Sequence, residues 1–392
     1  MNPEAKYKVE FIEDTNEWES FLKETDPNIF VQSALYGDFF RAMGEEAFIL
    51  GVRETAPNGE TAPNGENAPN FPQGKLIAGS LVVTTTARRG RFLYLPYGPK
   101  LDFSNQELWA TFAGELKKIA RIFKADFVRV SPFADDTPQL AEAFKKVGFR
   151  SAPMHVLAET TWILDLTPSE EELFKAMRST TRNLIHRGER EGVEIRISED
   201  DFALKRLNDL LQETALRHKF VPFSFKYMKA EFDSFKAHKQ AHSHDHDHAT
   251  QSTPANSDSA TPAHSAPGHS AKVFEAYFEG KLASSAVIFF YGDTAVYRHG
   301  ASSSERIKCQ PSYLLQWRAI QEAKKLGLKY YNFWGIAPQD APKHHPFAGI
   351  TTFKTGFGGF QKDLLHCHDL PVTPKYWFNW LIETIRRIKR GF

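Results

Sequence analysis

The chain has 392 residues, 41% hydrophobic and 25% charged, which suits two domains of ordinary size, each with its own core. Its 49 Lys and Arg residues and 48 Asp and Glu residues give a net charge of +1, which excludes a general attraction to nucleic acid or anionic lipid, so a polyanion needs a local basic cluster. The first residues lack the apolar core of a signal peptide, and no run of about 18 apolar residues occurs, so we expect a cytoplasmic protein.

In the first half of the chain, hydrophobic periodicity alternates between helix and strand. It predicts helices over residues 18–24, 36–43, 108–123 and 137–147, and strands over 79–86, 91–97 and 127–132. Between the apolar runs 47–52 and 75–86, a unit TAPNGE recurs whose Pro, Asn and Gly favour turns and supply no core. We therefore predict a β-hairpin with an expanded low-complexity loop, 54–74, in a first domain over residues 1–155.

The second half repeats this alternation. Helices are predicted over residues 169–192, 201–219 and 312–326, and strands over 273–278, 283–291, 294–301 and 330–333. The His-rich segment 237–271 has almost no large apolar residue, so we expect a disordered insertion in a second domain over 156–369. The final residues, 370–392, are expected to join the first domain. The whole pattern predicts two similar α/β (α+β) halves with mixed sheets.

Metal and redox chemistry have weak support. Four histidines of the insertion could bind Zn²⁺ or Ni²⁺ like an affinity tag, but a solvated linker is the favoured interpretation because nothing there would fix the ligands: His242, His244, His246 and His248. Cys309 and Cys367 are not spaced as a metal pair and are expected to be free thiols in a reducing cytosol. We expect neither a functional metal nor a cofactor.

Three segments carry residues suited to binding an anionic substrate. On a continuous helix, Arg178 and Arg182 share one face, and paired guanidiniums suit phosphate; the alternative is a solvated face paired with Glu189 and Glu191. Where the strand 91–97 leaves through a Gly-Pro turn, Tyr97 and Asp102 reach a loop edge, where binding groups concentrate. The alternative, which the residues alone favour, is a plain turn in which Asp102 caps the next segment.

The third segment places Lys354 among glycines at the end of an α/β unit. Three of the four residues 356–359 are Gly, which packing alone explains poorly and which lets a ligand backbone approach closely. A glycine-rich hairpin or bulge is the alternative.

Taken in order, these segments resemble the Fem family (FemA, FemB, FemX) of peptidoglycan-bridge aminoacyltransferases. The resemblance rests on six motifs in the right order: Phe30-Val31-Gln32-Ser33 with Tyr36 to Arg41, Tyr97-Gly98-Pro99, Thr181-Arg182-Asn183 followed by Gly192-Val193, Tyr313 to Trp317, Trp334-Gly335-Ile336, and Phe353-Lys354. It implies two GNAT-like domains, aminoacyl-tRNA as donor, and a peptidoglycan precursor, UDP-MurNAc-peptide or lipid II, as acceptor.

The resemblance also implies residue roles. Arg41 and Arg182, with Arg178 as an alternative, would hold the precursor diphosphate. Tyr97 and Asp102 would line the precursor groove, as would Tyr297 or Tyr313. Phe353 and Lys354 would face the acceptor end of the tRNA. Three features depart from the family pattern: Arg41 replaces Lys, Asn332 stands where an acidic residue is common, and the usual helical arm is replaced or shortened near the His-rich insertion.

An aminoacyl ester is already activated, so the reaction needs chiefly positioning and charge stabilisation. We expect Lys354 to supply positive charge and Asp102, or the bound phosphates, to take the proton of the attacking amine. Two alternatives remain: an acyl-CoA-dependent N-acyltransferase, although no convincing [RQ]xxGx[GA] loop occurs, and a non-catalytic precursor-binding module. The segment 375–392 is amphipathic and basic, which suits either packing on the first domain or peripheral contact with the inner membrane surface.

Overall fold

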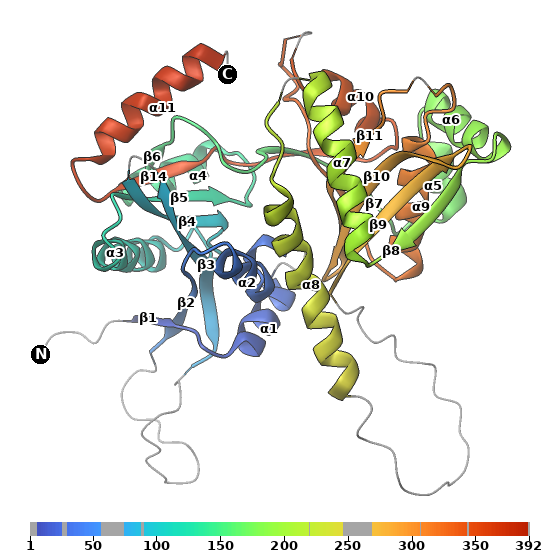
Figure 1. Ribbon diagram of the computed structural model, residues 1–392. Helices are drawn as coiled ribbons and strands as arrows, with labels where there is room; N and C mark the ends of the chain where they lie inside the picture. The colour runs from blue at the N-terminus through green and yellow to red at the C-terminus, as the bar shows by residue number, and fades with distance from the viewer. Residues whose placement is uncertain are drawn as a thin grey trace, which may run out of the picture. The chain divides into compact units, whose positions relative to one another are not determined.

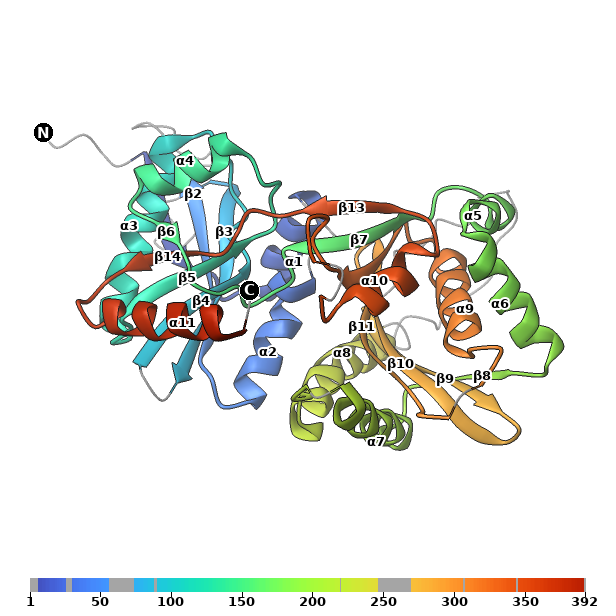
Figure 2. The ribbon, with the colours of Figure 1, turned by 90° about the horizontal axis from the view of Figure 1, so that it is seen from above.

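The computed structural model describes residues 6–25, 30–55, 74–87, 90–218, 220–245, 269–305, 307–342 and 345–390 (Figure 1). The chain divides into two units. Unit 1 comprises residues 1–159 and 363–392, and unit 2 comprises residues 160–362. Unit 1 therefore resumes at Asp363, earlier than the boundary of 370 expected from the sequence. In each unit, helices cover a mixed seven-stranded sheet (Figure 2).

Unit 1 has a sheet of order β1-β2-β3-β4-β5-β14-β6, in which β4 and β5 are parallel. Its elements are β1 (Tyr7–Phe11), α1 (Thr15–Thr25), the 3₁₀ helix η1 (Phe30–Gln32), α2 (Ala34–Ala42), β2 (Ala47–Glu54), β3 (Leu76–Ala87), β4 (Gly90–Tyr97), α3 (Gln106–Ile122), β5 (Phe127–Pro132), α4 (Pro138–Lys146), β6 (Arg150–Ser151), β14 (His368–Pro371) and α11 (Tyr376–Arg390). The core forms where Trp109, Phe112 and Leu116 of α3 pack on the sheet.

Unit 2 has a sheet of order β13-β7-β12-β11-β10-β9-β8, in which β11 and β12 are parallel. Its elements are β7 (Thr160–Asp165), α5 (Glu170–Ala176), α6 (Ser179–Arg190), β8 (Glu194–Ser198), α7 (Asp201–His218), α8 (Phe225–Asp245), β9 (Ser270–Phe278), β10 (Lys281–Tyr291), β11 (Thr294–Ser302), α9 (Ser312–Lys325), β12 (Tyr330–Gly335), α10 (Ala348–Thr355) and β13 (Phe360–Asp363). Leu315, Ala319 and Ile320 of α9 anchor its core.

Both units connect their parallel strands through a helix, α3 in unit 1 and α9 in unit 2, as expected for a βαβ crossover. The predicted α/β class with two mixed sheets is confirmed. The predicted hairpin is also confirmed, because β2 and β3 pair antiparallel from Ala47–Val83 to Arg53–Leu76. The loop between them lies outside the described residues. Both cysteines are buried free thiols.

Three secondary-structure predictions were wrong. The helix expected over 169–192 is broken at Met177, which has an extended backbone and a buried side chain. The helix α8 was missed, although Met228, Phe232 and Phe235 repeat at helical spacing and are buried. The insertion expected over 237–271 is narrower, because α8 continues to Asp245 and β9 begins at Ser270. The rest of it, apart from His269, lies outside the described residues, as do the side chains proposed to bind metal.

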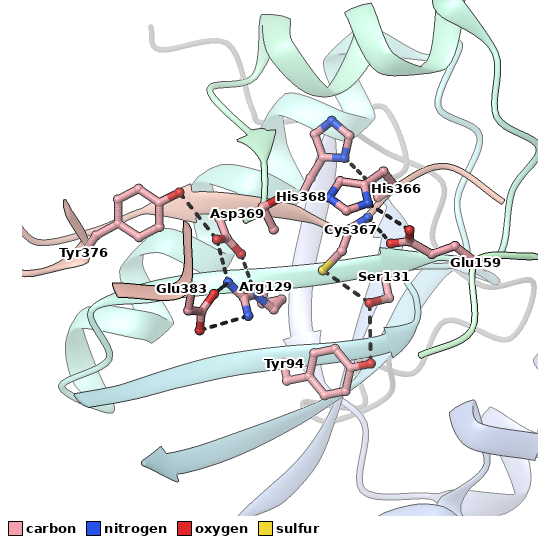
Figure 3. Close-up of polar contacts among 11 residues, drawn as sticks. Tyr94, Arg129, Ser131, Glu159, His366, Cys367, His368, Asp369, Tyr376 and Glu383 are labelled. Carbon is pink, nitrogen blue, oxygen red and sulfur yellow. Dashed lines mark hydrogen bonds and ion pairs between the residues drawn. The ribbon is translucent and has the colours of Figure 1, made fainter. Parts of the chain in front are cut away.

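The C-terminal segment is fastened to unit 1 by a buried polar cluster (Figure 3). The guanidinium of Arg129 on β5 donates two hydrogen bonds to Asp369 of β14, at 2.7 and 2.8 Å, and two to Glu383 of α11, at 2.8 and 3.4 Å. The imidazole of His366 contacts Glu159 at 2.8 Å, where the chain leaves unit 1, and this carboxylate raises the pKa of His366. These contacts hold β14 and α11 on the first sheet.

Candidate functional site

A buried lysine marks the point in unit 2 where its two parallel strands stop pairing. The last pair of the β11–β12 ladder is Val296–Asn332, and the next residue of β11 is Tyr297. Lys354, in the last turn of α10, places its Nζ 5.7 Å from the centroid of the Tyr297 ring. The lysine is only 6% exposed, and its Nζ donates a hydrogen bond to the carbonyl oxygen of Gly335 at 2.6 Å.

Burial lowers the pKa of Lys354 from 10.5 to about 7. The charged and neutral forms of its amine are therefore both populated near neutral pH. An ordinary lysine is almost entirely protonated there, so it serves as a fixed charge and not as a proton acceptor. Lys354 can therefore provide a positive charge in its protonated form and accept a proton in its neutral form.

A β-bulge in β12 precedes the carbonyl that Lys354 contacts. Asn332 faces Ile163 of β7 and Gly335 faces Thr161, so two residues of β12 lie opposite one residue of β7. Trp334 within the bulge has φ of +65°, and its N–H donates to the side-chain oxygen of Asn332 at 2.8 Å. Asn332, which the sequence marked only as a departure from the family pattern, thus supports the bulge.

An aromatic cluster lies beside the lysine. The Tyr313 ring, at the start of α9, lies 4.9 Å from that of Phe353 and 5.8 Å from that of Phe357, and Phe357 lies 5.4 Å from Phe333. Burial raises the pKa of Tyr313, and it raises the pKa of Tyr297 to about 12. Both phenols therefore stay neutral at physiological pH.

Arg178 forms hydrogen bonds to the end of α10 that carries Lys354. Its Nη2 donates to the carbonyl oxygen of Thr352 at 2.9 Å and to Oγ1 of Thr355 at 2.8 Å, and its backbone N–H donates to the carbonyl oxygen of Gly356. A cation at this position also stabilises the C-terminal end of the helix dipole. A Cβ at residue 356 would lie 2.4 Å from Oγ1 of Thr181, so only glycine allows this close packing.

The sequence interpretation of this glycine-rich segment needs correction. Lys354 lies in a helix, whereas the alternative considered for it was a hairpin or bulge. The glycines after it are explained by packing: besides Gly356, residue 359 has φ of +100°, and a Cβ there would lie 2.4 Å from the carbonyl oxygen of Ile163.

Arg182 lies one turn along α6 and contacts another helix end. Its Nη1 donates to the carbonyl oxygens of Lys175 and Met177, at the end of α5. The two arginines do not share the face of one continuous helix, because Arg178 is the extended residue immediately before α6. Each guanidinium instead satisfies carbonyl groups at a helix C-terminus.

A buried ion pair involves the two residues of β11 that follow Tyr297. Glu231 of α8 accepts hydrogen bonds from Nε of Arg298 at 2.8 Å and contacts Nε2 of His299 at 2.8 Å. The Arg298 guanidinium lies 5.4 Å from the Trp334 ring centroid, next to the bulge. Sequence reasoning missed these residues; the available signal was the pair Arg298-His299 immediately after Tyr297.

The remaining predicted site residues lie in unit 1. Tyr97 ends β4 with φ of +52°, is buried, and donates its hydroxyl to the carbonyl oxygen of Ala158 at 2.6 Å. Gln32, from the first motif of the resemblance, accepts from the N–H of Leu81 at 2.9 Å and donates to the carbonyl oxygen of Pro96. This buried amide connects η1 to the strand end that carries Tyr97.

Asp102 and Arg41 are exposed and engaged in local contacts. Asp102 accepts hydrogen bonds from the backbone and hydroxyl of Ser104, which lower its pKa and make it a weaker base. Arg41 of α2 forms an ion pair with Asp38, and its Nη2 donates to the carbonyl oxygen of Ala47 at 3.0 Å. The structure thus gathers Arg178, Tyr297, Tyr313, Phe353 and Lys354 in unit 2, and leaves Arg41, Tyr97 and Asp102 in unit 1.

The described residues hold neither a metal-type cluster nor a membrane-spanning helix. In these parts of the chain, no group of three or more His, Cys, Asp or Glu side chains is placed to hold a metal ion. Among the helices that the structure describes, none combines the length and apolar character needed to cross a bilayer.

Comparison with known proteins agrees with this architecture. A solved structure, "Crystal structure of FemX", superposes with a TM-score of 0.72 at 16% identity, covering 96% of this chain and 100% of that one. A tandem GNAT protein from the clavulanic acid biosynthesis pathway gives 0.50 at 11% identity over 94% of this chain and 99% of its own. A Bacteroides thetaiotaomicron protein of unknown function gives 0.53 at 10% identity, over 92% and 99%. These likenesses show the predicted fold, two GNAT-like domains.

No curated protein matches the sequence. The model of the FemAB family matches residues 14–242 and 236–384, which is nearly the whole chain. The chain belongs to the FemAB family.

Proposed function

We propose that this protein is a peptidoglycan-bridge aminoacyltransferase. Aminoacyl-tRNA is the donor, and the acceptor is an amine on the stem peptide of UDP-MurNAc-pentapeptide or lipid II. Membership of the FemAB family and the GNAT-like fold support the class of reaction. The observation that carries the proposal is the buried Lys354, with a pKa of about 7, beside Tyr297 and Gly335.

In the proposed reaction, the stem-peptide amine attacks the ester carbonyl of aminoacyl-tRNA. A C–N bond forms, the ester C–O bond breaks, and the ribose hydroxyl leaves with a proton. The ammonium form of Lys354 stabilises the oxyanion of the tetrahedral intermediate and is a proton source for the leaving oxygen. Its lowered pKa favours this donation, because a lysine of ordinary pKa holds its proton too tightly at neutral pH.

The other residues have supporting roles in the proposal. Phe353 and Tyr313 offer aromatic faces to the terminal adenosine of the tRNA, since bases stack on such rings. Arg182 of unit 2 binds the precursor diphosphate, with Arg41 of unit 1 as the other candidate, and Tyr97 lines the groove for the peptide. Asp102 is the weaker candidate for the general base because its pKa is lowered, so the bound phosphates are favoured for that role.

The deciding experiment incubates the protein with a mixture of charged tRNAs and each precursor in turn, and identifies the product by mass. An acceptor heavier by one aminoacyl residue, formed only with charged tRNA, supports the proposal. Acylation from acetyl-CoA without tRNA would favour an acyl-CoA-dependent transferase. Precursor binding with no consumption of charged tRNA would leave a binding module.

A further inference from the structure

The C-terminal helix α11 attaches to unit 1 through its polar side. It contacts the unit through the buried residues Tyr376 and Asn379. Glu383 accepts a hydrogen bond from Arg129 (Figure 3), while Trp377 lies against Arg150. At about 100° per residue, Tyr376, Asn379 and Glu383 share one side of the helix. An amphipathic helix that packs on a domain ordinarily turns its apolar stripe toward the core. In α11 the side that packs on the domain carries Asn379 and Glu383, and most of the apolar stripe is exposed.

Most of the apolar side of α11 is exposed, and only Trp377 at its start lies against unit 1, beside Arg150. Five large apolar side chains are 44% to 70% exposed and fall within an arc of about 100° opposite the packed side: Trp377, Phe378, Leu381, Ile385 and Ile388. Single exposed apolar residues are common on proteins, but a continuous stripe of this kind indicates an interaction surface. We call these five residues the outer stripe.

Exposed basic side chains accompany the outer stripe at the C-terminal end of α11. Lys389 borders the outer stripe, whereas Arg386 and Arg387 lie nearer the two edges of the packed side, and all three are exposed near the C-terminal end of the helix. The one acidic residue of the helix, Glu383, is occupied by Arg129. Arg150 of β6 adds a further cation, its guanidinium 4.6 Å from the ring centroid of Trp377. The helix therefore presents an apolar stripe together with exposed cations at its C-terminal end.

We propose that α11 binds the surface of an anionic lipid bilayer, lying in the plane of the interface with the outer stripe among the acyl chains. Lipid matches both features of this surface, because the apolar residues enter the acyl boundary while Lys and Arg remain at the anionic headgroups. Tryptophan is favoured at this depth. The 15 residues of α11 are too short to cross the roughly 30 Å hydrocarbon core, so the helix lies on the membrane.

The test is flotation of the full chain with vesicles of phosphatidylcholine alone or with phosphatidylglycerol added. The first variant is Leu381→Ser/Ile385→Ser/Ile388→Ser. Its control, Ile122→Ser/Leu216→Ser/Val221→Ser, removes three apolar residues elsewhere that are even more exposed. A third protein carries Arg386→Glu/Arg387→Glu/Lys389→Glu. All substitutions are on exposed side chains, so the thermal midpoints are expected to match that of the unmodified chain.

The unmodified chain and the control are expected to float with anionic vesicles. The outer-stripe variant should lose about tenfold or more in partitioning, and the charge-reversal variant should lose its preference for anionic lipid. Failure of the unmodified chain to float, or equal loss in the control, would overturn the proposal.

Two further results would assign the surface to another partner. Sedimentation velocity that shows a dimer broken by the outer-stripe variant assigns it to a second copy of the chain. Loss of tRNA binding on charge reversal, with vesicle binding intact, assigns it to RNA. Transfer to a soluble precursor should be unchanged in these variants, so failure of this proposal is distinguishable from failure of the proposed function.

Discussion

The Nζ of Lys354 and the carbonyl oxygen of Gly335 are joined by a 2.6 Å hydrogen bond between a helix end and a bulged strand end. The bulge before Gly335 positions the carbonyl oxygen, and the hydrogen bond from Arg178 to α10 positions the helix end that carries the amine. Because the amine is buried, its position is fixed and its proton affinity is reduced.

Replacing Lys354 with Met is expected to lower the rate of aminoacyl transfer by about 10² to 10³-fold, the usual effect of losing one group that stabilises an oxyanion. Met has a similar length and suits the buried position, so the fold should persist. Transfer is measured under single-turnover conditions with saturating charged tRNA.

The matched control for this change is Lys205→Met, which removes a 61% exposed lysine from the same unit. It should transfer at the rate of the unmodified chain. Full activity in the Lys354→Met protein would remove this residue from the mechanism.

The lowered pKa of Lys354 also makes the free energy of unfolding depend on pH. Its folded-state pKa of about 7 lies below the unfolded value of 10.5, so between these two values the unfolded state binds more protons and stability rises with pH. Relative to Lys354→Met, the free energy of unfolding of the unmodified chain should therefore increase by up to about 1.4 kcal/mol per pH unit in this window. Below pH 7 the difference should be constant.

This prediction is measured by urea unfolding of both proteins from pH 6 to pH 9. The Lys205→Met control should track the unmodified chain at every pH. A difference that does not change with pH would mean that the buried amine keeps its ordinary pKa.

Local patterns predicted much of the fold. The strand expected over 127–132 coincides with β5, and the helix expected from residue 169 starts there, with Ser169 as the N-cap of α5, since both depend on neighbouring residues. The break at Met177 was missed because its cause is distant in sequence: the N–H of Arg178 bonds to Gly356. For the same reason the sequence grouped Lys354 with its glycines but could not reveal the carbonyl of Gly335 as its partner.

The orientation of α11 is a similar case. Periodicity identified an amphipathic helix in the final residues and left open whether it packs on the first domain or contacts a membrane. What decides the orientation is Arg129, which lies 254 residues before Glu383 in the chain and draws the polar side of the helix to the sheet.

Arg178 is expected to act as a positioning residue for Lys354. Arg178→Met removes two hydrogen bonds to α10, so kcat should fall about tenfold while KM for the precursor changes little. Arg182→Met is the matched comparison, because its guanidinium bonds to the end of α5 and is proposed to hold the diphosphate. That variant should raise KM for the precursor and leave kcat nearly unchanged. Steady-state kinetics with varied precursor measure both constants, and a rise in KM for Arg178→Met would instead place this arginine on the substrate.

Removing the centre of the buried cluster is expected to destabilise unit 1. Arg129→Met leaves the fully buried carboxylate of Asp369 without its ion pair, which typically costs about 3 to 5 kcal/mol. The double variant Arg129→Met/Asp369→Leu should recover much of this loss, since no buried charge remains, and Glu383 can reach water.

The pH dependence separates this cause from a simple packing defect. Burial already raises the pKa of Asp369, and loss of Arg129 should raise it further. The carboxyl of the single variant should therefore take up a proton as the pH falls, and its deficit in the free energy of unfolding should shrink toward about pH 4. The double variant has no such group, so its deficit should be independent of pH. Urea unfolding of the three proteins at several pH values tests this, and a deficit in Arg129→Met that is equally large at low and neutral pH would point to lost packing around the guanidinium instead of an unpaired charge.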